Sequence, residues 1–125
     1  MNFKDFAYMN RHRSESPAGF NLPMNKWTLS DWFTELTGEL GEAANVCKKL
    51  NRFRAGARGN SESLDMLRSM LADEIADTFI CLDLLAQSQG IDLESAVIAK
   101  FNKTSKKIGY PDVLRDTRPQ SVYTK

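Results

Sequence analysis

The chain has 125 residues, of which 42% are hydrophobic and 26% charged, an ordinary composition for one globular domain spanning 1–125. The chain contains 17 lysines and arginines and 16 acidic residues, which gives a formal net charge of +1. This balance argues against a protein that binds polymeric nucleic acid mainly through its phosphates. No apolar run approaches the roughly 18 residues of a membrane span, and the start does not resemble a signal peptide. Cys47 and Cys81 form neither a disulfide framework nor a zinc site, so we expect a reduced, cytoplasmic setting with both as small core residues.

The first third of the chain predicts a short helix, a loop and the start of a long helix. Residues 2–12 place apolar side chains on one side, and 14–26 contain two prolines and a glycine, which indicate a loop. The segment "TLSD" then offers Thr28 or Ser30 as the N-cap of a helix that extends to about 50–53.

A basic connector and a second long helix follow. Residues 52–63 are rich in arginine and glycine, which favours a connector. Ser61 or Ser63 is a suitable N-cap for a helix that runs to Gln89 and ends at Gly90.

The last predicted helix is followed by a segment without periodicity. Asp92 caps a helix over 93–108, and Gly109 ends it. Residues 110–125 predict a C-terminal arm. Because no segment alternates as a strand does, the predicted class is all-α, a helical bundle whose core comes from helix–helix packing.

Two acidic residues of the second long helix occupy its apolar face. At about 100° per residue, Glu74 projects between Leu67 and Cys81, and Asp77 lies inside the same arc. Asp73 and Asp83 fall outside this arc, where we expect solvated acids.

The first long helix repeats this arrangement. Glu39 points between Trp32 and Val46 on the apolar face, while Glu35 and Glu42 lie at its rim. Glu39 and Glu42 are three residues apart, so both project from one side of the helix, as do the two acids of the other helix.

Isolated buried carboxylates are costly and normally acquire a partner, a raised pKa or a metal. Carboxylate oxygens are ligands that Mg²⁺ and Mn²⁺ prefer, so Glu39, Glu42, Glu74 and Asp77 are predicted metal ligands. The alternative is that these acids meet lysine or arginine in structural salt bridges.

The acid pairs "ELGE" (39–42) and "EIAD" (74–77) resemble the ExxE…ExxD signature of the MazG-like superfamily, the all-α nucleoside triphosphate pyrophosphohydrolases. The resemblance spans about 27–111. It implies cleavage of a nucleoside triphosphate between its α- and β-phosphates, with Mg²⁺ or Mn²⁺ bound by the four acids. Some phage-borne relatives act on dGTP and GTP, which are the expected substrates; dUTP or dCTP is the alternative.

The resemblance also bears on catalysis. Many members carry an additional acid just before the first Glu of the motif as a candidate general base, and this chain has Gly38 there. Glu39 is therefore predicted as a ligand with a catalytic part, and Glu35, one turn earlier, as the group that orients the water.

Basic residues on the third long helix are candidate phosphate contacts. Lys100, Lys103 and Lys107 lie along its apolar side, and Lys48 near the end of the first long helix could also reach a triphosphate. The alternative is that the stems of the lysines cover apolar surface while their ammonium groups reach water, and that Lys48 is solvated.

Base recognition needs a flat apolar slot and a few directional polar groups. Trp27 and the Asn21 amide are the predicted base contacts, although Trp27 could equally pack the bundle. Asn102 joins them as the nearest counterpart of an asparagine in a K…N…R pattern of the family.

One function of a different class stays open: a non-enzymatic helical adaptor, which would use the inward acids for salt bridges in an oligomer interface. A di-iron bundle is set aside, because it would need Glu-x-x-His pairs and the only histidine is His12. Helices with such broad apolar faces predict a homo-dimer or homo-tetramer.

Overall fold

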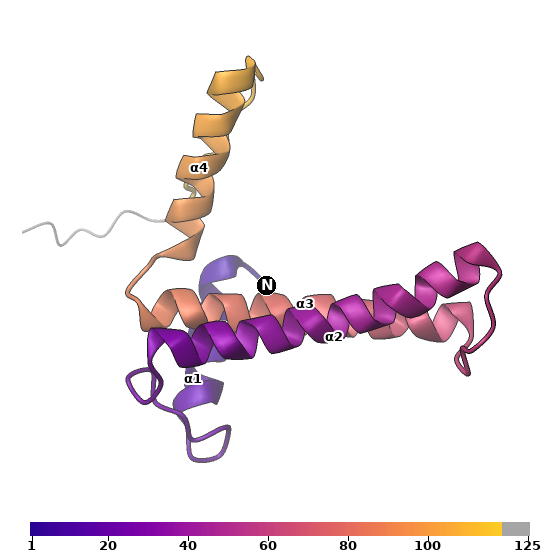
Figure 1. Ribbon diagram of the computed structural model, residues 1–125. Coiled ribbons are helices and arrows are strands. Elements are labelled where there is room, and N and C mark those ends of the chain that lie inside the picture. Colours follow the sequence, from indigo (N-terminus) through magenta and orange to yellow (C-terminus); the bar gives the residue numbers. More distant parts are fainter. Residues whose placement is uncertain (119–125) are drawn as a thin grey trace, which may run out of the picture. The chain divides into compact units, whose positions relative to one another are not determined.

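The computed structural model describes residues 1–118, and over this range the chain is entirely helical outside its loops (Figure 1). The predicted all-α class is confirmed. The chain divides into two compact units, Met1–Gly90 and Ile91–Lys125, so the interpretation as one domain stays a prediction. None of the helices described here combines the length and apolarity needed to cross a membrane.

Helix α1 (Phe3–Glu15) begins at the Asn2 N-cap, whose side chain accepts a hydrogen bond from the Asp5 amide. It ends three residues later than predicted. The helix ends at Ser16 because a residue that precedes proline is pushed out of the α region, and Ser16 has extended backbone angles.

Helix α2 (Leu29–Ala55) starts with the predicted capping box, in which Thr28 and Asp31 bond each other's backbone amides. It continues through part of the predicted connector and stops at Gly56. That glycine adopts the left-handed conformation, φ 67°, which closes a helix C-terminus at little cost.

Helix α3 (Leu64–Ser88) begins at Ser63, one of the two predicted caps, and runs antiparallel beside α2 (Figure 1). The connector between the two helices is held at α2. The Asn60 amide donates to the Lys49 carbonyl at 2.7 Å, and the Lys49 ammonium group pairs with Glu62.

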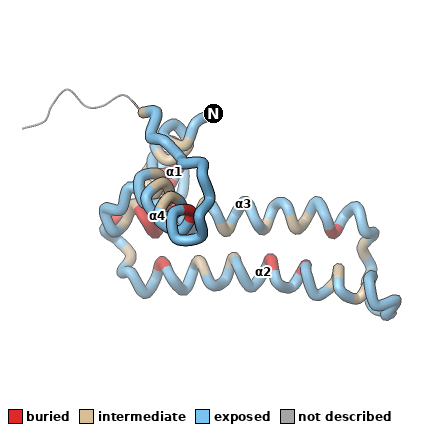
Figure 2. Tube along the Cα trace, turned by 90° about the horizontal axis from the view of Figure 1, so that it is seen from above, coloured by how far each residue is buried: buried red, intermediate tan, exposed pale blue. Residues whose placement is uncertain are grey.

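The core of the first unit lies at the end of the α2–α3 pair that receives the loop after α1. Trp32, Leu84, Leu85 and Met24 are buried there. Figure 2 shows the buried positions on the facing sides of α2 and α3. These two helices also carry exposed apolar side chains: Phe33, Leu40, Ile75, Phe79 and Leu82.

Helix α1 is joined to α3 by hydrogen bonds among the buried Asn10 and Asp83 and the partly buried Gln87. One Asp83 carboxylate oxygen accepts hydrogen bonds from the Asn10 and Gln87 side-chain amides, each at 2.9 Å. Gln87 also donates to the Ala7 carbonyl of α1. The prediction that Asp83 is solvated was wrong, since α1 covers it and it is 1% exposed.

The two cysteines differ in burial. Cys81 is buried as predicted, but the prediction that Cys47 is a core residue was wrong, because it is exposed on α2. The main partner of α2 is α3, and this packing leaves position 47 exposed.

The second unit contains α4 (Leu93–Ile108), bounded by the predicted cap Asp92 and by Gly109. The segment after the helix is held against it by two hydrogen bonds between the Asn102 amide and the Leu114 backbone, both 2.8 Å. Arg118 pairs with Asp92, Glu94 and Asp116. The remainder of the predicted arm, 119–125, lies outside the described residues.

Candidate metal centre and adjacent cavity

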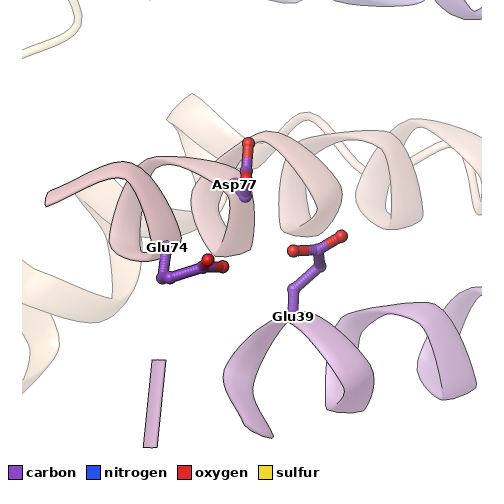
Figure 3. Close-up of side chains that lie close together, drawn as sticks. All are labelled: Glu39, Glu74 and Asp77. Atoms are coloured by element: carbon purple, nitrogen blue, oxygen red, sulfur yellow. The ribbon is translucent and has the colours of Figure 1, made fainter. Parts of the chain in front are cut away.

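Three carboxylates from two helices converge between α2 and α3. Glu39 of α2 and Glu74 and Asp77 of α3 each offer an oxygen, and these three oxygens all lie within 4.8 Å of one another. Figure 3 shows Glu39 extending toward the helix that carries the other two. The helix spacing brings Glu74 and Asp77 to one side of α3, and the antiparallel pairing of α2 places Glu39 opposite them.

Two of these carboxylates hold buried oxygens without a partner. Oε2 of Glu39 and Oε2 of Glu74 are inaccessible to solvent and accept no hydrogen bond from residues 1–118. A buried anionic oxygen that lacks a donor is costly, which makes such a place favourable for a cation.

The local electrostatic environment is negative. Burial is the main cause that raises the pKa of Glu39, and Glu42, Asp77, Glu35 and Glu74 raise it further by their charges. Burial and a hydrogen bond with Glu42 likewise raise the pKa of Glu74. The neighbouring negative charges therefore make ionisation of Glu39 and Glu74 harder, and a divalent cation would relieve this repulsion.

The fourth predicted ligand, Glu42, lies beside this group of three. It is exposed and close enough to Glu74 to share a hydrogen bond with it. Three all-oxygen ligands with a fourth at the side suit Mg²⁺ or Mn²⁺ by donor chemistry.

The alternative of structural salt bridges can be compared with the ion pairs of residues 1–118. The acids in those pairs are Glu15, Glu62, Asp92, Glu94 and Asp116. Within this described range, no lysine or arginine pairs with the three converging carboxylates. The alternative that these acids form structural salt bridges therefore has no cationic partner here.

A cavity of about 360 Å³ opens beside the carboxylates, entirely within the first unit. Glu39 and Asp77 belong both to its lining and to the group of three acids, and Glu35 lines it as well. The remainder of the wall is mainly apolar and aromatic: Phe20, Leu22, Trp27, Trp32, Ile80, Cys81 and Leu84.

The aromatic wall has a defined geometry. Trp27 and Trp32 meet edge to face, with ring centroids 4.8 Å apart and planes at 62°. Trp32 is 2% exposed, and its indole N–H has no hydrogen-bond partner among the described residues. The Cys81 thiol nearby stays protonated at neutral pH, because burial, with smaller contributions from Glu35 and Glu39, raises its pKa to about 11.

The remaining wall comes from the end of α1 and the loop after it. The Leu22 amide donates to the Ser14 carbonyl at 2.7 Å, and the Ser14 hydroxyl donates to the Leu22 carbonyl at 3.1 Å. The Phe20 amide donates to the Arg13 carbonyl at 3.0 Å. Gly19 is required by this close approach, because a Cβ there would lie 1.9 Å from the Arg13 carbonyl oxygen.

The predicted base contacts differ in their placement. Trp27 lines the cavity, whereas Asn21 is exposed and does not line it, although both its neighbours do. The Asn102 amide is occupied on both sides by the Leu114 backbone. A base-binding role for Asn21 or Asn102 stays a prediction without support from these contacts.

The predicted phosphate contacts are exposed lysines. Lys48 lies on α2 in the unit that holds the acids, while Lys100, Lys103 and Lys107 lie on α4 in the other unit. Their roles stay predictions.

Sequence reasoning missed Arg13, Ile80 and Leu84 as cavity residues. Arg13 is the only lysine or arginine in the cavity lining, and it lies in the last turn of α1, just beyond the range 2–12 that the sequence predicts as helix. Its position depends on how α1 and its loop dock, which no local pattern signals.

No family model, no curated protein and no solved structure matches this chain. The likeness to MazG-like enzymes therefore rests on the two acid pairs and stays an expectation. The function is inferred from the residues of the site themselves.

Proposed function

We propose that this protein is a metal-dependent pyrophosphohydrolase of the MazG-like type. It would cleave a nucleoside triphosphate between the α- and β-phosphates and release a monophosphate and pyrophosphate. Glu39, Glu42, Glu74 and Asp77 would hold Mg²⁺ or Mn²⁺, with dGTP or GTP as the first substrates to test.

One observation carries this proposal. The oxygens of Glu39, Glu74 and Asp77 lie within 4.8 Å of one another, Glu39 and Glu74 each have a buried oxygen without a donor, and Glu39 and Asp77 also border an aromatic-lined cavity. A cation site that adjoins a slot for a planar ring is the arrangement that a metal–nucleotide complex requires.

A bound divalent ion supplies charge neutralisation at the phosphate oxygens and makes a coordinated water more acidic. The chain's own contribution is to orient the water and keep the cavity apolar. Glu35 is exposed and lines the cavity one helical turn before Glu39, where it could replace the acid missing at Gly38. It is the proposed water-orienting base.

A homo-dimer or homo-tetramer is part of the proposal. Phe33, Leu40, Ile75 and Phe79 are each more than two-fifths exposed on α2 and α3. Large apolar side chains gathered on one pair of helices are typical of a surface that another subunit covers.

The test is a panel of nucleoside triphosphates incubated with Mg²⁺ or Mn²⁺, with the products separated by chromatography. We expect a monophosphate and pyrophosphate from at least one nucleotide; a diphosphate and orthophosphate would contradict the proposed bond cleavage. Inclusion of dUTP and dCTP decides between the two expected substrate groups.

The matched variants are Glu74→Gln and Asp65→Asn, two changes of acid to amide on α3. Glu74→Gln removes a converging carboxylate and should lower kcat/KM by about a hundred-fold or more. Asp65 is an exposed acid in the first turn, so its variant should keep the wild-type rate. Equal activity of both variants would show that the converging carboxylates take no part in the reaction. Complete inactivity of the wild type would favour the alternative of a non-enzymatic helical adaptor.

A further inference from the structure

We infer that Arg13 is a specificity-determining residue that selects a 6-oxopurine base, such as guanine, by donating to its N7 and O6 atoms. The inference rests on the proposed function, because it assigns the base of a nucleotide to the cavity beside the carboxylates. It concerns residues of the first unit alone.

The polar groups of the cavity divide into two sets. The carboxylates Glu39 and Asp77 belong to the converging acid group, and Glu35 adjoins them on α2. Away from these acids, Arg13 is the one charged residue of the lining. Its guanidinium can only donate hydrogen bonds.

The Ser14 hydroxyl at this wall already donates to the Leu22 carbonyl, so it has no proton left for a ligand. The donor that a base can meet here is therefore the Arg13 guanidinium, and the base should present acceptors to it. A base with a different edge forgoes these charge-assisted hydrogen bonds and binds less tightly.

Arg13 is held in place without being neutralised. Its guanidinium carbon lies 5.5 Å from the centroid of the Phe20 ring, a cation–π contact, and the Phe20 amide is bonded to the Arg13 carbonyl. Within residues 1–118 no carboxylate pairs with Arg13, whereas Arg11, two residues earlier, pairs with Glu15. Arg13 thus retains a free planar fork at the cavity wall.

The chemistry of the bases selects the ligand. Guanine presents two adjacent acceptors, N7 and O6, which match the fork of an arginine, whereas adenine replaces the second acceptor with an amino group. Uracil and thymine offer one acceptor on the corresponding edge, and cytosine offers an amino group. A fork that donates two parallel hydrogen bonds therefore favours a 6-oxopurine.

Binding can be measured without turnover through tryptophan fluorescence. The chain has two tryptophans, Trp27 and Trp32, and both line the cavity. We would titrate the full chain with dGMP, 7-deaza-dGMP and dAMP. The 7-deaza compound keeps the ring and O6 but lacks the N7 acceptor.

We expect dGMP to quench the fluorescence with an affinity about ten- to a hundred-fold above that of either other nucleotide. Arg13→Lys keeps the charge but loses the fork, so the preference for dGMP over 7-deaza-dGMP should disappear. Arg11→Lys is the matched control, because Arg11 lies outside the cavity lining, and should keep the wild-type preference. Thermal denaturation of each variant confirms that it is folded.

Kinetics separates this inference from the proposed function. With dGTP and 7-deaza-dGTP as substrates, Arg13→Lys should raise KM for dGTP and leave kcat within a few-fold, because the base contact is made equally in the ground and transition states. Hydrolysis of both nucleotides at equal rates would overturn the role of Arg13 but would be consistent with the proposed hydrolase activity. Selective binding of dGMP without hydrolysis of dGTP would overturn the proposed hydrolase activity but would support the base-binding role of Arg13.

Discussion

A carboxylate oxygen of Glu39 on α2 lies within 4.8 Å of a carboxylate oxygen of Glu74 on α3, and Oε2 of each residue is buried without a donor. Two helices packed along their length would be more stable with apolar residues at these positions. The free-energy cost of this pair is the physical basis of the following predictions.

Divalent ions should raise the melting temperature of the protein. A ligand that binds only the folded state stabilises it by mass action, by about 2.7 kcal/mol at a concentration one hundred times Kd. We expect Mn²⁺ or Mg²⁺ to produce a concentration-dependent rise in Tm, followed by calorimetry. The rise should vanish in Glu39→Gln and persist in Asp65→Asn; a similar rise in both variants would place the ion elsewhere.

The stability of the metal-free protein should depend on pH through Glu39 and Glu74. Their pKa values are raised above the ordinary 4.5, so the folded chain holds protons that the unfolded chain releases. Their stabilising contribution is complete below the ordinary pKa and is lost as pH rises through the raised pKa. With a chelator present, wild-type Tm should therefore fall relative to Glu39→Gln/Glu74→Gln as the pH rises toward neutrality. A difference in Tm that does not vary with pH would contradict this reading.

Replacement of Glu35 should separate catalysis from metal binding. Glu35 lines the cavity but lies outside the three converging carboxylates, so Glu35→Gln should lower kcat by about a hundred-fold, as loss of a general base does. The metal-dependent rise in Tm should remain close to that of the wild type. An unchanged kcat would remove Glu35 from the mechanism.

The buried acid that sequence reasoning placed in solvent should matter for folding. Asp83→Ala leaves the Asn10 and Gln87 amides without their shared acceptor, and each hydrogen bond to a charged group contributes about 1.5–3 kcal/mol. We expect a loss of about 3 kcal/mol in the free energy of unfolding, measured by urea denaturation. Asp73→Ala, at an exposed position of the same helix, should change it by less than about 0.5 kcal/mol.

Local pattern was sufficient for the elements and for the acid face. The capping box at Thr28, the Ser63 and Asp92 caps and the glycine at position 109 all stand where the helices begin or end. A helix boundary depends on hydrogen bonds within a few residues, so these signals are readable without the fold. The helical period of the apolar residues also predicted that Glu39, Glu74 and Asp77 lie on inward faces.

Other features were decided by packing between distant segments. Asp83 is buried because α1 covers it, and the Asn10 side-chain amide that donates a hydrogen bond to it is 73 residues away in the sequence. Arg13 and Phe20 become cavity residues because the loop after α1 folds back upon that helix. Helical periodicity records which residues share a face, but not which partner covers that face, and such pairings follow only from the tertiary contacts.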